Sequence, residues 1–214
     1  MNGFKTFSQP LRRGLFVASS ALMLLAALVY GLTLADYVFP GESAHLVAEW
    51  TGTDALSFPE HAIWGRIVSL VSGMAFSSST ALRINMISLV SGVLCAGLLC
   101  WLVAWFVHQC TRQEDTIRLS GVAAVVAGVT TALVFIFSTG TWQTSTHLDF
   151  HVFDVLFALL VFALFPLSAK LPKITWLFAA LIGLLAGAGL VESPIFVALM
   201  PLFLLALVVT SVKG

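Results

Sequence analysis

Six apolar runs alternate with short polar segments along this chain. Each run is close to the roughly 20 residues that a helix needs to cross a lipid bilayer. The pattern predicts membrane-spanning helices at about residues 14–35, 82–108, 119–138, 148–169, 174–190 and 194–212. No soluble domain, repeat or low-complexity tract interrupts them. We therefore predict an all-α membrane protein that forms a single membrane domain over residues 1–214.

The segment between the first two runs, residues 37–81, is too long and too patterned to be a plain loop. Pro40 and Gly41 end the first helix, because proline cannot continue a helix interior. We expect a short helix over residues 42–51 and another from Pro59, with apolar residues along one side. These helices fit a structured extracytoplasmic loop whose helices lie in the membrane interface. A shallow re-entrant hairpin is the alternative.

Charged residues sort between the two sides of the predicted membrane. One side receives eight of the ten cations: Lys5, Arg12, Arg13, Arg112, Arg118, Lys170, Lys173 and Lys213. The other side receives eight acids: Asp36, Glu42, Glu49, Asp54, Glu60, Asp149, Asp154 and Glu192. Lysine and arginine concentrate in short cytoplasmic loops. We therefore expect a multi-pass protein of the cytoplasmic membrane, with both termini cytoplasmic and an acidic outward-facing site.

Composition supports this class. Hydrophobic residues make up 59% of the chain and charged residues 9%, whereas about a quarter of a soluble domain is charged. The net charge of zero gives no reason to expect a nucleic-acid partner. Cys95, Cys100 and Cys110 match no metal signature, so we interpret them as packing residues. The first run is longer than the core of a cleaved signal peptide, which favours a retained anchor. Cleavage after Ala35 is the alternative.

The first candidate for chemistry lies in the outer loop. On a helix, Glu42, His45 and Glu49 share one face. A carboxylate fixed at the membrane surface can act as a general base toward an acceptor hydroxyl, or as a metal ligand. The alternative is the solvated face of an interfacial helix.

The second candidate lies at the outer end of the fourth run. His147 and His151 are four residues apart, and Asp154 follows His151 by three. Ionisable groups in a span usually face a cavity and have a role. His147, His151 and Asp154 are therefore candidate ligands of a divalent cation, or hydrogen-bonding partners of a phosphate or sugar. Asp149 points elsewhere unless the helix starts after it. The alternative is a helix that begins near Asp154.

Three further features lie on the outer side. Arg66 and Arg83 are the outward cations, and each can meet a phosphate or pair with an acid. Trp142 fits an aromatic belt or a stacking partner for a sugar. Glu192 is expected to be a loop residue or a first-turn acid favoured by the helix dipole.

Four stretches then follow an order that is known from one family. They are residues 40–44 (a Gly-Asp-Ser-Gly-Glu-like motif), 58–66 (a His-Pro-Pro-Gly-Tyr-Pro-like stretch, then Gly-Arg), 83–88 (an Arg-Val-Asn-Leu-like start of a span) and 141–154. In this order the chain resembles bacterial multi-pass proteins related to protein O-mannosyltransferases, within the C-type glycosyltransferase superfamily. Family members are longer, so the resemblance implies a short or truncated member.

The resemblance implies a donor sugar linked to a polyprenyl phosphate. Glu42 takes the acidic catalytic position of the first outer loop, where aspartate is usual, and Asp149 takes the acidic position of the fourth span. Arg66 or Arg83 meets the lipid phosphate. The further substrate-binding candidates are His45, Trp142, Gln143, His151 and Asp154.

The leading interpretation is a glycosyltransferase that acts at the extracytoplasmic face. Its expected partners are membrane lipid, the polyprenyl-phosphate sugar, a protein or glycan acceptor and further subunits, with a divalent cation as candidate cofactor. The alternative is a small transporter or membrane-complex subunit, whose acid and histidine residues bind a cation or relay protons.

Overall fold

The computed structural model describes residues 8–37, 42–50, 61–74, 79–110, 117–168 and 175–212. These residues form helices and connecting turns without a strand, so the predicted all-α class is confirmed. The helices are α1 (Gln9–Leu32), α2 (Glu42–Trp50), α3 (Ala62–Ser72), α4 (Thr80–Cys110), α5 (Ile117–Phe137), α6 (Thr139–Thr146), α7 (His151–Ser168), α8 (Thr175–Glu192) and α9 (Ile195–Val212).

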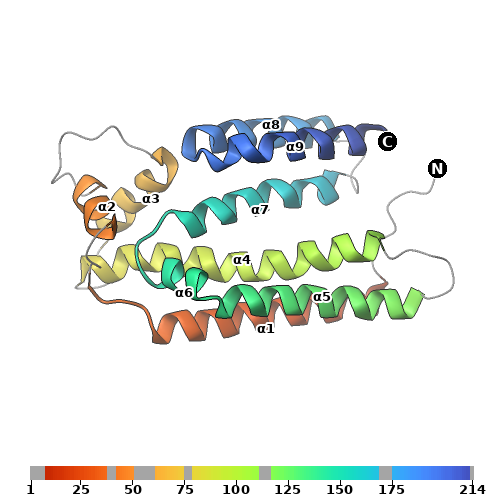
Figure 1. The fold of residues 1–214 in the computed structure, drawn as a ribbon, viewed down its shortest axis with the longest axis horizontal. Helices are drawn as coiled ribbons and strands as arrows, with labels where there is room; N and C mark the ends of the chain where they lie inside the picture. Colours follow the sequence, from red (N-terminus) through yellow and green to blue (C-terminus); the bar gives the residue numbers. More distant parts are fainter. Residues whose placement is uncertain are drawn as a thin grey trace.

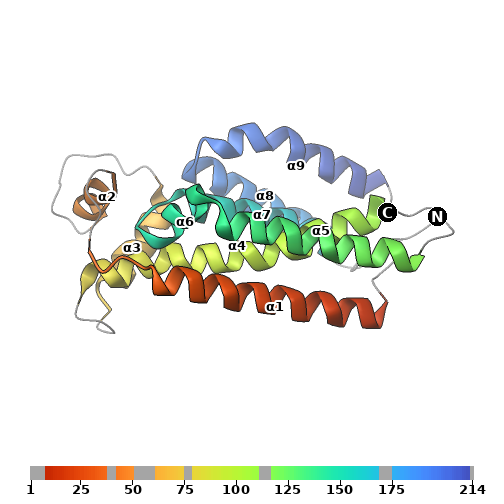
Figure 2. The same cartoon turned by 60° about the horizontal axis from the view of Figure 1, so that its bottom comes forward.

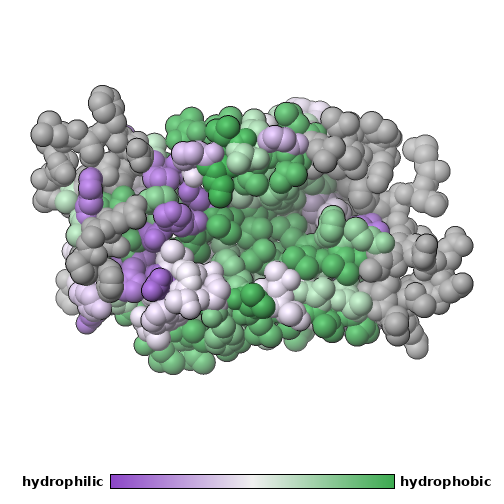
Figure 3. Space-filling view, in the orientation of Figure 1, coloured by the Kyte–Doolittle hydropathy of each residue, from purple (hydrophilic) through white to green (hydrophobic). Residues whose placement is uncertain are grey.

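The longer helices α1, α4, α5, α7, α8 and α9 run alongside one another down the long axis of the molecule (Figure 1). The short helices α2 and α3 cover one end of this bundle, and α6 lies close to the same end (Figures 1 and 2). Hydrophilic side chains gather there, whereas the middle of the bundle is hydrophobic (Figure 3). We call the end formed by α2, α3, α6 and the first turn of α7 the polar end.

Two described helices, α1 and α4, are long and apolar enough to cross a membrane on their own. Helices α5 and α6 make a third span if they are taken together across a bend of 63°. Helices α7, α8 and α9 are shorter apolar helices beside them. The bend follows from local sequence, because Ser138 begins α6 as its N-cap and its side chain accepts a hydrogen bond from the Thr141 amide.

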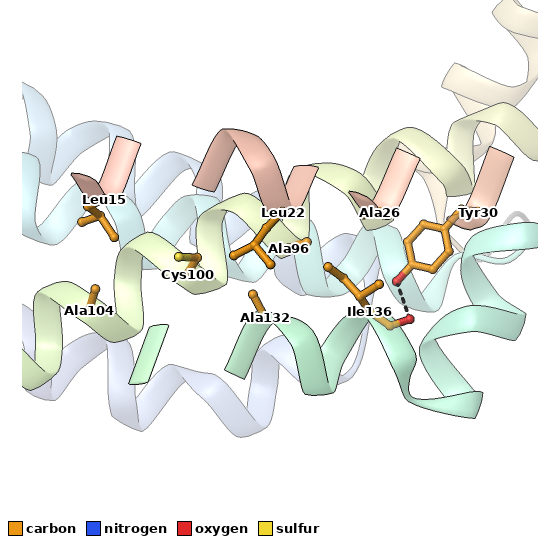
Figure 4. Close-up of a cluster of buried hydrophobic side chains, with 9 residues drawn as sticks. All are labelled: Leu15, Leu22, Ala26, Tyr30, Ala96, Cys100, Ala104, Ala132 and Ile136. Carbon is orange, nitrogen blue, oxygen red and sulfur yellow. Dashed lines mark hydrogen bonds between the residues drawn. The ribbon is translucent and has the colours of Figure 1, made fainter. Parts of the chain in front are cut away.

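Close packing of small residues holds α1, α4 and α5 together. Their shared core consists of Leu15, Leu22, Ala26, Tyr30, Ala96, Cys100, Ala104, Ala132 and Ile136 (Figure 4). A methyl group added at Gly128 would collide with the Cys100 carbonyl, so these backbones approach closely. The Tyr30 hydroxyl donates a hydrogen bond to the Ile136 carbonyl at 3.3 Å. A second core, rich in phenylalanine, joins α7, α8 and α9.

The two short helices expected in the first loop are present as α2 and α3. Helix α3 is not free at the surface, because Trp64 and Val68 are fully buried in a cluster with Ile84 of α4 and Leu148 before α7. The fourth apolar run becomes helical only at His151, so Asp149 precedes α7. The start of α3, the turn before α7 and the end of α8 therefore meet at the polar end.

The described charges follow the predicted sorting. Arg12 and Arg13 lie near the start of α1, at the end of the bundle opposite the polar end. Glu192 ends α8 at the polar end, where it contacts α3. The membrane face that each end occupies stays a prediction from the distribution of lysine and arginine.

Candidate functional site

The turn between α6 and α7 is fixed to α4 through Ser88. The Asp149 amide donates a hydrogen bond to the Ser88 hydroxyl at 3.1 Å, and that hydroxyl donates to the Asp149 carbonyl at 3.1 Å. Ser88 is fully buried, so the contact holds the backbone of Asp149 in place. The side chain of Asp149 is left to reach the surface of the polar end.

Asp149 and His151 form an acid–imidazole pair. Asp149 Oδ1 accepts hydrogen bonds from the His151 amide and from His151 Nδ1, each at 2.7 Å. The Asp149 side chain is 24% exposed and that of His151 is 60% exposed. A carboxylate against Nδ1 selects the tautomer with the proton on that nitrogen, which leaves Nε2 as a proton acceptor. The pair is therefore built as a base that solvent or substrate can reach.

Two pockets meet at Asp149. One, of about 620 Å³, is lined by residues 32–37, by Trp142, Gln143 and Thr144, and by His147 and Asp149. The other, of about 330 Å³, contains His151 and residues of α6 as well as Asp149. Both volumes fall in or near the range of small-molecule sites. Asp149 therefore lines both pockets.

A second acid–histidine group lies beneath this surface. His61, Asp154 and Glu192 are 6%, 4% and 2% exposed. One ligand atom from each lies within 4.8 Å of the other two. His61 Nδ1 is 3.8 Å from Asp154 Oδ1, which is too long for a hydrogen bond. The Ser193 side chain hydrogen-bonds the Asp154 carboxylate. We call His61, Asp154 and Glu192 the buried triad.

Glu192 connects α8 to α3. Its Oε2 accepts from the Ile63 amide at 2.7 Å, and its Oε1 accepts from the Trp64 amide at 2.9 Å. These amides belong to the first turn of α3, where the helix dipole favours a negative charge. The expectation of a loop residue or a first-turn acid of the following helix is wrong, because Glu192 is the buried last residue of α8. It caps a helix more than 120 residues earlier in the chain.

Phe150 links the exposed pair to the buried triad. Its ring stacks on His61 with centroids 3.6 Å apart and on His151 with centroids 4.3 Å apart. Trp64 meets the same ring edge-on at 6.3 Å. The two acid–histidine groups are therefore separate in their partners but share one aromatic neighbour.

The three metal candidates have different partners in the structure. They are His147, His151 and Asp154. His147 Nδ1 lies 3.0 Å from the Gln143 carbonyl and 3.2 Å from the Thr146 hydroxyl. His151 pairs with Asp149, and the nearest imidazole recorded for Asp154 is that of His61. His147 and His151 also belong to no common helix, because α6 ends at Thr146 and α7 begins at His151. In the described part of the chain, the acid and histidine residues that lie close enough together to hold a metal ion are those of the buried triad.

The remaining candidates differ in exposure and in hydrogen-bond partners. His45 is exposed on α2 and Arg66 is exposed on α3. Arg83 donates to the Met74 carbonyl at 2.6 Å and to the Thr80 hydroxyl at 2.8 Å. Trp142 donates through Nε1 to the Thr33 hydroxyl at 2.9 Å. Glu42 begins α2, and its side chain is outside the described residues.

Sequence reasoning missed two members of the buried triad. His61 appeared only inside a motif stretch, with no role assigned to it. For Glu192 the available signal was an acidic residue between two apolar runs, in a chain of 214 residues with ten acids. The partners of both residues lie far away in the sequence, so no local spacing predicts the group.

Comparison with curated proteins and with solved structures finds no match. Comparison with protein-family models finds the protein O-mannosyl-transferase TMEM260 N-terminal domain, which matches residues 58–213. The match confirms the relation to protein O-mannosyltransferases that the motifs suggested. It includes Asp149, His151 and the buried triad, and it begins after Glu42. The chain belongs to the family of the protein O-mannosyl-transferase TMEM260 N-terminal domain.

Proposed function

We propose that this chain transfers a sugar from a polyprenyl-phosphate donor to a hydroxyl of a protein or glycan acceptor, at the extracytoplasmic face of the cytoplasmic membrane. The observation that carries the proposal is the family match over residues 58–213. The accessible Asp149–His151 pair beside two pockets supports it. The charge distribution supports an outward-facing polar end.

The reaction needs a proton acceptor near the hydroxyl. The acceptor oxygen bonds the anomeric carbon, and the bond from that carbon to the phosphate oxygen breaks. Polyprenyl phosphate leaves with the electron pair. His151 Nε2 takes the hydroxyl proton, and Asp149, at 2.7 Å from Nδ1, stabilises the imidazolium that forms. By the family resemblance, Glu42 contributes a second carboxylate from the loop.

The donor phosphate needs a cation. Arg66 is exposed on α3, whereas the Arg83 guanidinium already donates to Met74 and Thr80. Arg66 is therefore the better candidate for the phosphate, since a guanidinium recognises it with paired hydrogen bonds. The 620 Å³ pocket, which contains Trp142 and Gln143, supplies an aromatic ring and an amide for the sugar.

The test is transfer of radiolabelled mannose from a polyprenyl-phosphate mannose to a serine- and threonine-rich peptide, by the full chain in lipid nanodiscs. Asp149→Asn and His151→Ala should each lower the rate by about 10²–10⁴-fold, the usual contribution of a general base. Arg66→Ala should raise the KM for the donor. Arg13→Gln, at the opposite end of the bundle, is the control and should keep the wild-type rate.

Wild-type transfer by Asp149→Asn would contradict the role of the pair. Absence of transfer and of thermal stabilisation with every sugar in a panel of polyprenyl-phosphate donors would contradict the enzyme itself. The transport alternative makes a different prediction: proteoliposomes would show a flux that depends on an ion gradient. Substitutions at His147, His151 and Asp154 would then stop that flux without any sugar transfer.

A further inference from the structure

We propose that the buried triad binds a divalent transition-metal ion, Zn²⁺ or Mn²⁺, which joins α3, α7 and α8 at the polar end. The proposal concerns His61, Asp154 and Glu192, none of which faces the two pockets that contain Asp149. It does not rest on the proposed sugar transfer.

The first observation is a pair of unsatisfied buried atoms. Within the described part of the chain, His61 Nδ1 and Asp154 Oδ1 are buried and have no hydrogen-bond partner, although they lie 3.8 Å apart. Buried polar atoms are nearly always paired, and an orphaned one indicates a missing water or ion. Both residues are more than nine-tenths buried. A species that accepts electron pairs from both atoms satisfies them together.

The second observation is uncompensated charge. In the part of the chain that the structure describes, neither Asp154 nor Glu192 forms an ion pair with lysine or arginine. Burying an unpaired carboxylate costs several kcal/mol, and a second one nearby adds repulsion. Each oxygen of the Glu192 carboxylate accepts one hydrogen bond from a backbone amide and keeps a further lone pair. A divalent cation offsets both charges at one point.

The donor set selects the kind of metal. One imidazole nitrogen and two carboxylates suit zinc or manganese, whereas magnesium and calcium prefer oxygen ligands alone. Ligand atoms of tetrahedral zinc lie about 3.4 Å apart, given bonds of about 2.1 Å. The ligand atoms of the triad lie within 4.8 Å of one another, so binding requires the side chains to close by at most about 1.4 Å.

The backbone of His61 adds a further sign that its position is imposed. Alone among the described non-glycine residues, it has a positive φ, of 60°. The left-handed conformation costs a residue other than glycine roughly 1–2 kcal/mol. Such strain persists where the surroundings fix the residue, and it often accompanies a functional role. The His61 imidazole is buried and lies beside Asp154 rather than in solvent.

The experiment uses the full chain, purified in detergent with an affinity tag that contains no histidine. After chelation, the protein is incubated with Zn²⁺ or Mn²⁺ in excess Mg²⁺, and the bound metal is counted by elemental analysis. We expect about one ion per chain and a higher melting temperature. Asp154→Asn and His61→Gly should lose the ion, and glycine accepts the left-handed backbone without strain. His45→Ala, which removes an exposed histidine of α2, is the matched control for metal content.

A wild-type measurement does not depend on how the variants fold. Pulsed electron paramagnetic resonance of the Mn²⁺-loaded chain should show nitrogen hyperfine coupling from one imidazole, and His61→Gly should abolish it. Background metal levels in the wild type, with no change in melting, would overturn the proposal and leave a water between the two atoms. Full metal retention by both Asp154→Asn and His61→Gly would overturn it equally.

Discussion

The exposed pair and the buried triad contain the same chemical groups in opposite surroundings. Asp149 and His151 are open to solvent and linked at 2.7 Å, whereas His61 and Asp154 are 6% exposed in their side chains and 3.8 Å apart. The first group has its strong hydrogen bond already made and keeps one imidazole nitrogen for a reactant. Among the residues that the structure describes, the second has unsatisfied atoms and two carboxylates without a lysine or arginine partner. In the two roles that we propose, burial distinguishes a cation-binding group from a base made of the same residue types.

The largest expected effect on the comparison is at Glu192. Changing Glu192→Ala leaves the Ile63 and Trp64 amides without acceptors. Each unsatisfied buried donor costs about 1–3 kcal/mol, so the unfolding free energy should fall by about 2–5 kcal/mol. Denaturant titration in detergent measures it. Asp36→Asn, an exposed carboxylate, should remain within about 0.5 kcal/mol of wild type. Equal stabilities of the two variants would refute the capping role.

A smaller effect is expected at Ser88, which supports the exposed pair from behind. Ser88→Ala removes both hydrogen bonds to the Asp149 backbone, so the carboxylate loses its position. We expect sugar transfer to slow by about tenfold, which equals ~1.4 kcal/mol in the barrier. Ser91 is the matched control, because its hydroxyl bonds the Ile87 carbonyl of its own helix. Equal transfer rates for Ser88→Ala and Ser91→Ala would show that Ser88 does not position Asp149.

The shared neighbour Phe150 tests how strongly the exposed pair depends on the ring that also stacks on His61. Phe150→Leu removes stacking on both histidines, which is worth about 0.5–1.5 kcal/mol. A double-mutant cycle with His151→Ala should give a coupling energy in that range. Phe153→Leu, which stacks on Phe157 instead, should couple to His151→Ala by less than about 0.3 kcal/mol. Similar coupling from both phenylalanines would show that the stacking is not specific.

The smallest expected effect is the change in melting temperature on substitution of Asp149. The Asp149–His151 contact is partly solvated, and such ion pairs contribute about 0–1 kcal/mol. In the presence of Zn²⁺, Asp149→Asn should therefore lower the melting temperature by no more than about 4 °C, while Asp154→Asn should lower it further because the bound ion is lost. Differential scanning fluorimetry of the two isosteric variants measures this contrast. A larger shift for Asp149→Asn than for Asp154→Asn would reverse our assignment of the two groups.

The sequence predicted what depends on local pattern. Apolar runs predicted the long helices. The pairing of Asp149 with His151 was not predicted, because the sequence left open whether the helix begins after Asp149, as α7 does. The bend between α5 and α6 was not predicted, because its cause is the N-cap formed by Ser138 inside a largely apolar segment. Glu192 was misread because its contacts are 128 and 129 residues away, and the following Ser193 and Pro194 resemble an ordinary loop.

The long separation between Glu192 and α3 also sets an order of assembly. A ribosome adds about 5–20 residues per second, so α8 emerges roughly 6–26 s after Ile63, which lies 129 residues before Glu192. Until then the first amides of α3 depend on water or on the lipid headgroups for their hydrogen bonds. Trp64 and Val68 can pack against Ile84 of α4 before that point, but the Ile63 and Trp64 amides gain the Glu192 carboxylate only when the end of α8 arrives.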